Sequence, residues 1–244
     1  MIKELEDYNW FPGLFRRFQV EYIGSVVRWL NIYKPVVPLY REMVEKNKPL
    51  YIQDLCSGSG APLLYLASHI DAGIKIVLSD KFPDNHFTDS DKVVYKKDPV
   101  DALSFTPGHG VMYTQFNALH HFEDGDKRRL AGKLCESGNP FLFVEITEPG
   151  LVSMVKILFT TLVLQLLTAP LVKPFSLLRL FFTYLIPVNL FTVTYDGIIS
   201  VMKSRTVQQY KQLFGRSGSN NFEISVNSFS NWKGTIVIIS GGIL

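Results

Sequence analysis

The sequence predicts an α/β protein built around a seven-stranded, mostly parallel sheet. From residue 50 to residue 146, short apolar β-rich segments alternate with helical segments. Near the C-terminus, two further β-rich segments follow one another with only a short turn between them. Alternation is typical of a parallel sheet with helices on both faces, whereas a short connection requires antiparallel strands. With 244 residues, the chain is long enough to bury a substantial core.

Each element has a local signal. The expected strands cover residues 50–54, 74–80, 92–95, 110–116, 140–146, 222–226 and 234–239. Helices are expected after residue 61 and over residues 124–137. Residues 13–32 carry apolar side chains at i, i+4 spacing, which predicts an amphipathic helix. That helix either packs on the sheet only or forms a lid over a ligand.

A glycine-containing loop, residues 56–60, follows the first strand, which ends in Asp54. Its two glycines permit positive φ and close approach of a ligand to the backbone. A phosphate-binding loop would continue from Gly60 with lysine, and a dinucleotide-binding loop would have a third glycine in place of Leu63. The sequence has neither the lysine nor the third glycine, and an acidic residue precedes the loop. Such a loop suits a ligand other than a phosphate.

Further polar residues stand at the ends of the next strands. Asp80 ends the second strand, about 20 residues past the loop, where a carboxylate can accept hydrogen bonds from ribose hydroxyls. Asp101 and Ala102 follow the third strand. The fourth strand runs into Asn117-Ala118-Leu119-His120-His121-Phe122.

This ordered series resembles the class I S-adenosylmethionine (SAM)-dependent methyltransferases. Asp54 to Gly60 is similar to their motif I, Asp80 to the acid that binds ribose, and residues 117–122 to a form of motif IV. The resemblance implies a sheet with an antiparallel last strand and S-adenosyl-L-methionine as the cofactor. The cofactor-binding residues that it implies are Asp54, Cys56, Ser57, Gly58, Gly60, Asp80, Lys81, Asp101, Ala102, Phe116 and Asn117.

Methyl transfer depends mainly on alignment of the acceptor with the methyl group and on exclusion of water. For an acceptor with a hydroxyl group, His120 is the candidate general base, although it could equally be a structural histidine. Glu145 and Glu148 either bind a polar group of the acceptor or are solvated. The expected acceptor-binding residues are Trp10, His120, His121, Glu145 and Glu148. No metal site is predicted, because these residues lack a tight metal-ligand spacing.

Two segments far apart in the sequence resemble those of a subgroup of the same family. The opening segment has the pattern E-x-x-D-x-x-W-F-P from Glu4 to Pro12. The later one has the pattern D-G-x-x-S from Asp196 to Ser200. The residues after Ser200 depart from the subgroup, so the resemblance implies no role for them.

Residues 150–196 are unusually apolar. Ile157–Val172 and Leu180–Tyr195 are uncharged runs of 16 residues, just short of the roughly 20 that a membrane-spanning helix needs. A helical hairpin inserted after the fifth strand is therefore expected. It could pack on the protein, lie in a membrane surface, or form the wall of an apolar acceptor pocket.

The predicted organisation is a helical lid over residues 1–48, a SAM-binding domain over residues 49–149 and 197–244, and the apolar insertion between them. The predicted function is methyl transfer to a hydrophobic small molecule, with a lipid-like or quinone-like acceptor in view. The alternative is a non-catalytic protein of the same fold that binds a membrane or a partner through the insertion.

Composition narrows the partners. The formal net charge is +3 without a dense basic stripe, so nucleic acid is not expected as a partner. The two cysteines, Cys56 and Cys135, show no disulfide framework, and the N-terminal segment lacks the apolar stretch of a signal peptide. Both observations favour a cytoplasmic protein, peripheral at the inner face of the membrane if the insertion binds there. The oligomeric state is not predicted.

Overall fold

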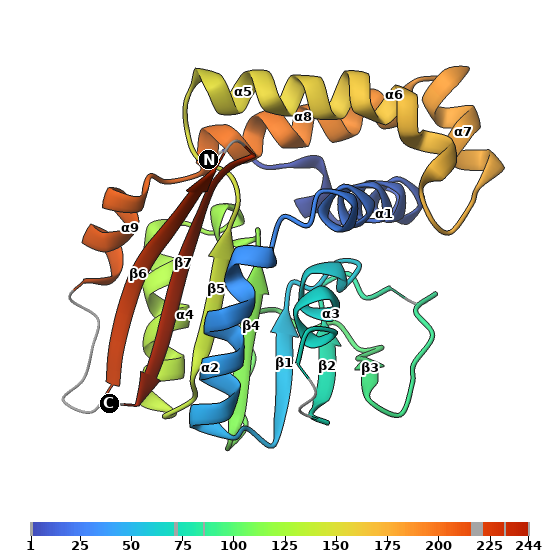
Figure 1. Cartoon of the computed structure of the whole chain (residues 1–244). Helices are drawn as coiled ribbons and strands as arrows, with labels where there is room; N and C mark the ends of the chain where they lie inside the picture. The colour runs from blue at the N-terminus through green and yellow to red at the C-terminus, as the bar shows by residue number, and fades with distance from the viewer. Residues whose placement is uncertain (1, 71–72, 85, 216–221, 232, 244) are drawn as a thin grey trace.

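The computed structural model describes residues 2–70, 73–84, 86–215, 222–231 and 233–243. Within them, seven strands form one sheet in the order β3-β2-β1-β4-β5-β7-β6 (Figure 1). The strands are β1 (Tyr51–Leu55), β2 (Lys75–Ser79), β3 (Val93–Tyr95), β4 (Val111–Phe116), β5 (Phe141–Glu145), β6 (Phe222–Asn231) and β7 (Gly234–Ile243). Strands β1 to β5 are parallel, and β7 is antiparallel to both β5 and β6. The predicted mostly parallel sheet with an antiparallel last strand is confirmed.

Helices cover both faces of the sheet, so β4 and β5 are buried along their whole length. On one face lie α2 (Val37–Asn47) and α3 (Ala61–Ala67), and on the other lie α4 (Asp124–Glu136) and α9 (Val207–Phe214). Side chains of β5 alternate between the two cores. Leu142 and Val144 join the core under α2 and α3, while Phe141 and Phe143 join the core under α4 and α9.

A second layer of helices lies beyond the carboxyl ends of the parallel strands (Figure 1). It consists of α1 (Gly13–Trp29) and of residues 151–203, which we call the apolar cap. The cap contains α5 (Leu151–Leu158), the π-helical turn η4 (Phe159–Leu164), α6 (Gln165–Thr168), the 3-10 turn η5 (Ala169–Leu171), α7 (Leu177–Tyr184) and α8 (Val188–Lys203). A small core that includes Tyr22 and Val26 of α1 and Val193 of α8 joins the helix α1 to the cap.

The first helix of the cap is longer than the sequence analysis predicted. Helical structure runs without a break from Leu151 to Leu171, over 21 residues, and its most apolar window of 18 residues has a mean hydropathy of 1.9 and is only 11% buried. The uncharged run is thus part of a longer helix that is long and apolar enough to cross a membrane, because Lys156 interrupts the uncharged sequence but not the helix. In the second run, α7 and α8 meet at a bend of 77°.

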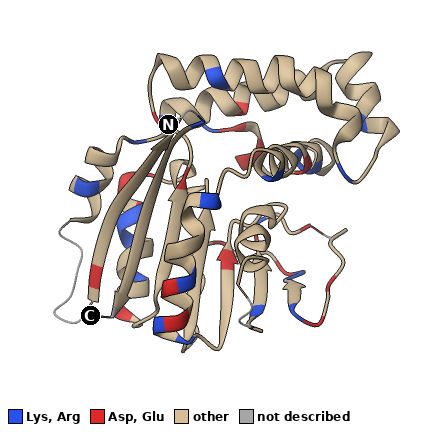
Figure 2. Cartoon of the chain, in the orientation of Figure 1, with Lys and Arg blue, Asp and Glu red and all other residues tan. Residues whose placement is uncertain are grey.

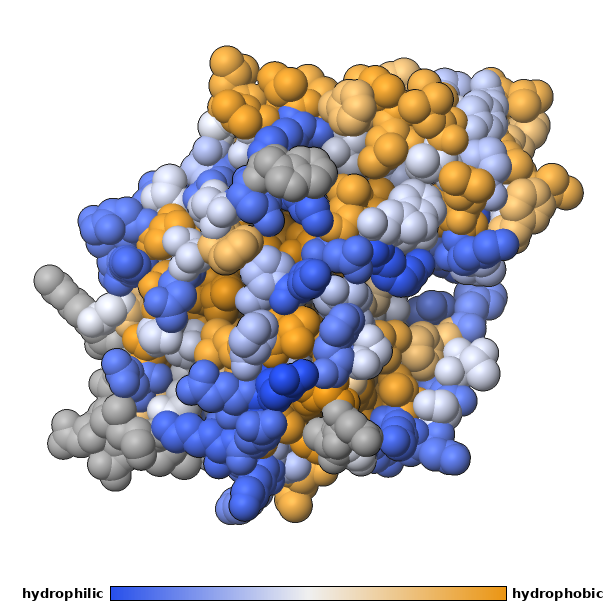
Figure 3. Space-filling view, in the orientation of Figure 1, coloured by the Kyte–Doolittle hydropathy of each residue, from blue (hydrophilic) through white to orange (hydrophobic). Residues whose placement is uncertain are grey.

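Charged side chains are scarce in this cap and frequent on the rest of the protein (Figure 2). Many large apolar side chains of the cap are exposed, among them Leu151, Leu167, Leu177, Leu185 and Phe191, each at least 72% exposed. The space-filling view shows hydrophobic residues along the whole edge that the cap forms (Figure 3). An ordinary surface helix buries such a stripe, so this one requires an explanation.

Candidate functional site

A cleft of about 2030 Å³ lies between the carboxyl edge of the sheet, the helix α1 and the cap. Most of the predicted site residues line it: Cys56, Ser57, Gly58, Asp80, Lys81, Asp101, Ala102, Phe116, Asn117, His120, His121 and Glu148. Four others, Asp54, Gly60, Glu145 and Trp10, are not among the lining residues. The strand-end residues thus converge at the edge where open α/β sheets bind ligands.

The glycine loop has a backbone that only glycine adopts readily. Gly58 has φ of +51° and Gly60 has φ of +68°. A Cβ atom on Gly60 would lie 2.5 Å from Cδ1 of Leu78 in β2, so a larger residue would have to displace a core side chain. The helix α1 packs closely against the loop, since a Cβ atom on Gly24 of α1 would lie 2.6 Å from Oγ of Ser59.

Asp54 lies beneath this loop and supports it. Its Oδ1 accepts a hydrogen bond of 2.6 Å from the hydroxyl of Thr114. Its backbone carbonyl accepts hydrogen bonds from the hydroxyls of Ser57 at 3.0 Å and Ser79 at 2.6 Å. Burial raises the pKa of Asp54 to about 7. Asp54 therefore contributes to the shape of the loop rather than to the surface of the cleft.

Asp80 connects the end of β2 to the glycine loop. Its Oδ2 accepts a hydrogen bond of 2.9 Å from the backbone N–H of Gly58, and its Oδ1 accepts one of 2.9 Å from the N–H of Phe82. Burial raises the pKa of Asp80, while these two hydrogen bonds lower it. Further along the edge, Oδ1 of Asp101 accepts a hydrogen bond of 2.8 Å from the N–H of Leu103.

Two residues at this edge have left-handed backbone although they are not glycine. Cys56 after β1 has φ of +54°, and Asn117 after β4 has φ of +52°. The N–H of Asn117 donates a hydrogen bond of 2.6 Å to the carbonyl of Val144, which keeps the chain at the sheet edge. Left-handed backbone at a non-glycine residue is costly, and such strain concentrates at functional sites.

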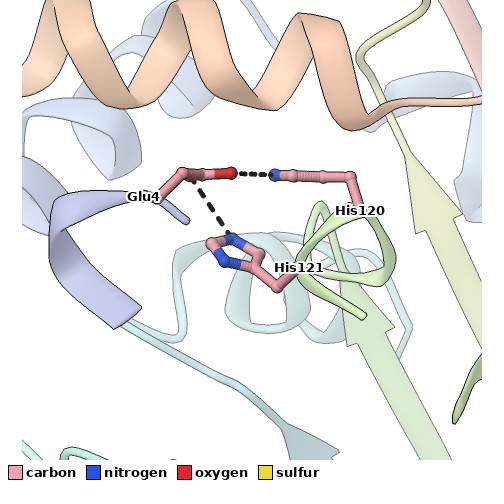
Figure 4. Close-up of side chains that lie close together, drawn as sticks. All are labelled: Glu4, His120 and His121. Carbon is pink, nitrogen blue, oxygen red and sulfur yellow. Dashed lines mark ion pairs between the residues drawn. The ribbon is translucent and has the colours of Figure 1, made fainter. Parts of the chain in front are cut away.

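The two histidines of the motif after β4 lie in the 3-10 turn η3 (Leu119–His121) and point toward Glu4 (Figure 4). Nδ1 of His120 lies 2.7 Å from Oε2 of Glu145, and its Nε2 lies 3.6 Å from Oε1 of Glu4. Nδ1 of His121 lies 2.9 Å from Oδ1 of Asp7, and its Nε2 lies 3.6 Å from Oε2 of Glu4. Nε2 of His121 also lies 3.6 Å from Oε1 of Glu6, so every ring nitrogen of the two histidines faces at least one carboxylate.

The segment that carries Glu4 is held by α8. Asp196 accepts hydrogen bonds from the backbone N–H groups of Leu5 at 2.6 Å and Glu6 at 3.3 Å, and from Nε2 of Gln19 at 2.8 Å. The hydroxyl of Ser200 donates a hydrogen bond of 3.1 Å to Oε2 of Glu4. The two motifs at residues 4–12 and 196–200 therefore meet in the structure and orient one side chain at the cleft.

This cluster is rich in carboxyl groups, and their pKa values are displaced. Burial raises the pKa of Glu6 to about 8 and that of Asp196 to about 6. Burial alone would lower the pKa of His121, but Glu4 and the hydrogen bond to Asp7 raise it to about 10. The nearest lysine is Lys203, with Nζ 3.7 Å from Oε1 of Glu4 and 3.7 Å from Oδ2 of Asp7.

Three site residues escaped the sequence analysis or were placed differently from their expected roles. Trp10 is 67% exposed and packs against Tyr8 and Phe11 away from the lining of the cleft. Glu145 is fully buried behind His120 and does not reach the cleft. Glu4 was noted only as part of a motif, and its E-x-x-D spacing was the one signal for its role.

The topology and the position of the cleft together decide the fold family. Five parallel strands are followed by an antiparallel β7 that inserts between β5 and β6, and the site residues lie at the carboxyl edge. The chain has the class I methyltransferase fold.

Comparisons with known proteins find only distant likenesses. No protein-family model and no curated protein matches the chain. Among solved structures, human N-acetylserotonin methyltransferase in complex with SAM has 17% sequence identity and a TM-score of 0.46, over 81% of this chain and 49% of its own. The pyocyanin biosynthetic protein PhzM has 14% identity and a TM-score of 0.47, over 80% of this chain and 50% of its own. The plantazolicin methyltransferase BpumL in complex with SAH has 13% identity and a TM-score of 0.48, over 94% of this chain and 85% of its own.

This methyltransferase-fold chain thus spans about half the length of the first two proteins. Identities this low do not transfer a substrate or an activity. The function of this chain must therefore be inferred from the geometry of its own cleft.

Proposed function

We propose that the protein transfers a methyl group from SAM to a hydrophobic small-molecule acceptor. The observation that carries the proposal is the carboxylate of Asp80, which lines the cleft and is hydrogen-bonded to the N–H of Gly58 in a loop without lysine. A carboxylate beside a glycine loop without lysine repels a phosphate. It suits SAM, which carries a cationic sulfonium and has ribose hydroxyls that can donate hydrogen bonds. Asp80 would accept hydrogen bonds from the ribose, and Asp101 one from the adenine amino group.

The acceptor side of the cleft is apolar. Leu151, Val152, Val155 and Phe159 of the cap line the cleft and are also 57–80% exposed to the outside. The apolar wall of the cleft and the exposed apolar face of the cap therefore share one helix. This arrangement supports a lipid-like or quinone-like acceptor.

The chemistry requires little beyond alignment. Transfer of a methyl group to a nucleophile is a direct displacement, and enclosure between the cap and the sheet edge would align the acceptor and exclude water. For a hydroxyl acceptor, His120 is the candidate base as long as its Nε2 binds no metal ion. Its Nδ1 lies 2.7 Å from Oε2 of Glu145, which favours a proton on Nδ1 and a lone pair on the Nε2 that faces Glu4.

Calorimetry with SAM tests the cofactor assignment. We expect the wild-type chain to bind SAM and Asp80→Ala to lose at least tenfold in affinity, because the variant removes both the ribose acceptor and the loop hydrogen bond. Asp91→Ala, at an exposed acid outside the cleft, is the control and should bind like wild type. Absence of binding at millimolar SAM by a folded wild-type chain would overturn the proposal.

A second candidate function is a non-catalytic protein of this fold that docks through the cap, and the exposed apolar face favours it. We propose association with a membrane surface in either case, since Leu151–Leu171 has the length and composition of a lipid-contacting helix. Flotation with vesicles of phosphatidylcholine and phosphatidylglycerol tests the association. We expect the triple variant Leu167→Gln, Leu177→Gln, Leu185→Gln to lose flotation.

The control for this experiment is Leu50→Gln, at a residue that is equally exposed, at 74%, and directly precedes β1 at the opposite edge of the sheet. Equal flotation of the triple variant and wild type would remove the cap from this role. Resistance of the bound protein to alkaline carbonate would indicate a spanning helix instead of a surface one.

A further inference from the structure

Both histidines of the η3 turn are held in the same way. Nδ1 of His120 pairs with Glu145 at 2.7 Å, and Nδ1 of His121 pairs with Asp7 at 2.9 Å. A carboxylate on Nδ1 fixes the proton there, orients the ring and leaves Nε2 as a lone-pair donor. Histidines that bind metal ions are usually supported in this way. The Nε2 atoms of His120 and His121 both face Glu4, so two histidines already oriented by carboxylates present possible metal-binding nitrogens to the same place.

The group between the two Nε2 atoms is the carboxylate of Glu4, which is 2% exposed (Figure 4). Its Oε1 lies 3.6 Å from Nε2 of His120, and its Oε2 lies 3.6 Å from Nε2 of His121. Both distances exceed a hydrogen bond. Oε1 of Glu4 and Nε2 of His120 are buried without a hydrogen-bond partner among the described residues. Two unpartnered acceptor atoms in a buried site require a cation or a proton between them. His121 differs, because its pKa of about 10 places a proton on its Nε2 at neutral pH, and a bound metal ion would have to displace that proton.

We infer that Glu4, His120 and His121 form a binding site for a divalent transition-metal ion. Their ligand atoms all lie within 4.8 Å of one another. Two ligands that are each about 2.1 Å from one ion lie at most about 4.2 Å apart. The separations of 3.6 Å from Nε2 of His120 to Oε1 of Glu4 and from Nε2 of His121 to Oε2 of Glu4 lie within this limit, so an ion would be held with both carboxylate oxygens or after a small closing of the cluster. Glu145, which was grouped with the histidines from the sequence, lies behind His120 as its supporting carboxylate.

The surrounding charge favours a cation. The carboxyl groups at this cluster are Glu4, Glu6, Asp7, Glu145 and Asp196, of which Glu6, with a pKa of about 8, is protonated at neutral pH unless a bound cation lowers its pKa. The cationic side chains that face them are Lys203, 3.7 Å from Glu4, and Arg16, which donates hydrogen bonds to the backbone carbonyls of Glu6 and Tyr8. Lys203 thus competes with a metal ion for Glu4, and its removal should strengthen binding of the ion.

The donor set also indicates the class of metal. Two imidazole nitrogens and one carboxylate favour Zn²⁺, Fe²⁺ or Co²⁺ over Mg²⁺ and Ca²⁺, which prefer oxygen ligands. Three protein ligands leave coordination positions open. Glu4, His120 and His121 all line the cleft, so those positions face it. A role for the ion in binding an acceptor oxygen rests on the proposed function, whereas binding of the ion itself does not.

The test is a titration of the chelator-treated full chain, without SAM, with Co²⁺ followed by visible absorption and with Zn²⁺ followed by calorimetry. We expect one ion per chain and a ligand-field spectrum of an N,O site. Glu4→Gln and His121→Gln should each weaken binding at least tenfold, and Glu145→Gln should weaken it 10- to 100-fold through His120. His109→Gln, at an exposed histidine outside the cluster, should bind like wild type.

We expect Lys203→Met to bind Co²⁺ more tightly than wild type. Misfolding can only weaken binding, so a gain in affinity cannot result from it. Titration of each variant with SAM reports separately on the fold and on the cofactor site. Absence of a Co²⁺ spectrum in a wild-type chain that binds SAM would overturn the metal site and leave the proposed function standing. Equal Co²⁺ affinities of wild type, Glu4→Gln and His121→Gln would also overturn it.

Discussion

The cofactor edge of the sheet and the apolar cap face the same cleft but are built on different principles. At the edge, backbone conformation decides the shape: Gly58, Gly60, Cys56 and Asn117 all have positive φ, and Asp80 fixes the loop by hydrogen bonds. In the cap, ordinary helices are packed together and their outer side chains are apolar and exposed. One half therefore tolerates few substitutions, and the other should tolerate many at its outer surface.

The largest effect expected from this difference is at Gly60. We expect Gly60→Val to destabilise the fold by on the order of 3 kcal/mol, because φ of +68° disfavours a β-branched residue and a Cβ atom there would lie 2.5 Å from Leu78. SAM binding should be lost as well. Urea unfolding and calorimetry measure both.

The matched control is Gly132→Ala in α4, where a Cβ atom would have nothing within 4 Å. It should be stabilising by roughly 0.5–1 kcal/mol, as alanine is favoured over glycine inside a helix. Equal stability of Gly60→Val and wild type would contradict the claim that backbone conformation determines the shape of the cofactor edge.

A smaller and more selective effect is expected inside the cap. A Cβ atom on Gly197 of α8 would lie 2.7 Å from Cγ2 of Ile157 in α5, so Gly197→Val should separate the two helices and cost about 1–3 kcal/mol. SAM affinity should fall much less than in Gly60→Val, since both residues lie in the cap and not at the carboxyl edge of the sheet. The stability of the purified variant and its SAM affinity are the two measurements.

Ile157→Ala in the Gly197→Val background should restore part of the lost stability, because the shortened side chain makes room for valine. A double variant that is less stable than the sum of the single changes would contradict close packing at this contact.

The last effect is a dependence of stability on pH. Burial raises the pKa of Asp54 from 3.8 to about 7 in the folded chain, so the folded state binds more protons than the unfolded state between these values. The stability that this group contributes is therefore fully present below about pH 4 and is lost as the pH rises through 7. Asp54→Asn keeps an acceptor for Thr114 and should flatten the decline in melting temperature from about pH 4 to about pH 7. An unchanged slope would contradict a neutral Asp54 at low pH.

Much of the cofactor edge could be predicted from the sequence, because its signals are local. A strand that ends in an acid and a loop with two glycines are read within a few residues, and Asp80 and Asp101 take their places from the strand order alone. The role of Glu4 could not be predicted in this way. It depends on Asp196 and Ser200, at the far end of the sequence, which bring Glu4 to the histidines.

The cap shows a second kind of limit. The first uncharged run begins at Ile157, directly after Lys156. The helix begins earlier, at Leu151, because lysine is as compatible with a helix as an apolar residue is. Sequence hydropathy thus found the apolar character of the cap but not the length of its helix.

The most direct test of the central claim is a crystal structure of the full chain with S-adenosylhomocysteine. We expect density in the cleft, with the ribose on Asp80, the homocysteine part over Gly58 and the adenine beside Asp101. The sulfur should face the apolar wall of α5. An empty cleft at saturating ligand, or ligand bound away from Asp80, would contradict a SAM site at this edge of the sheet.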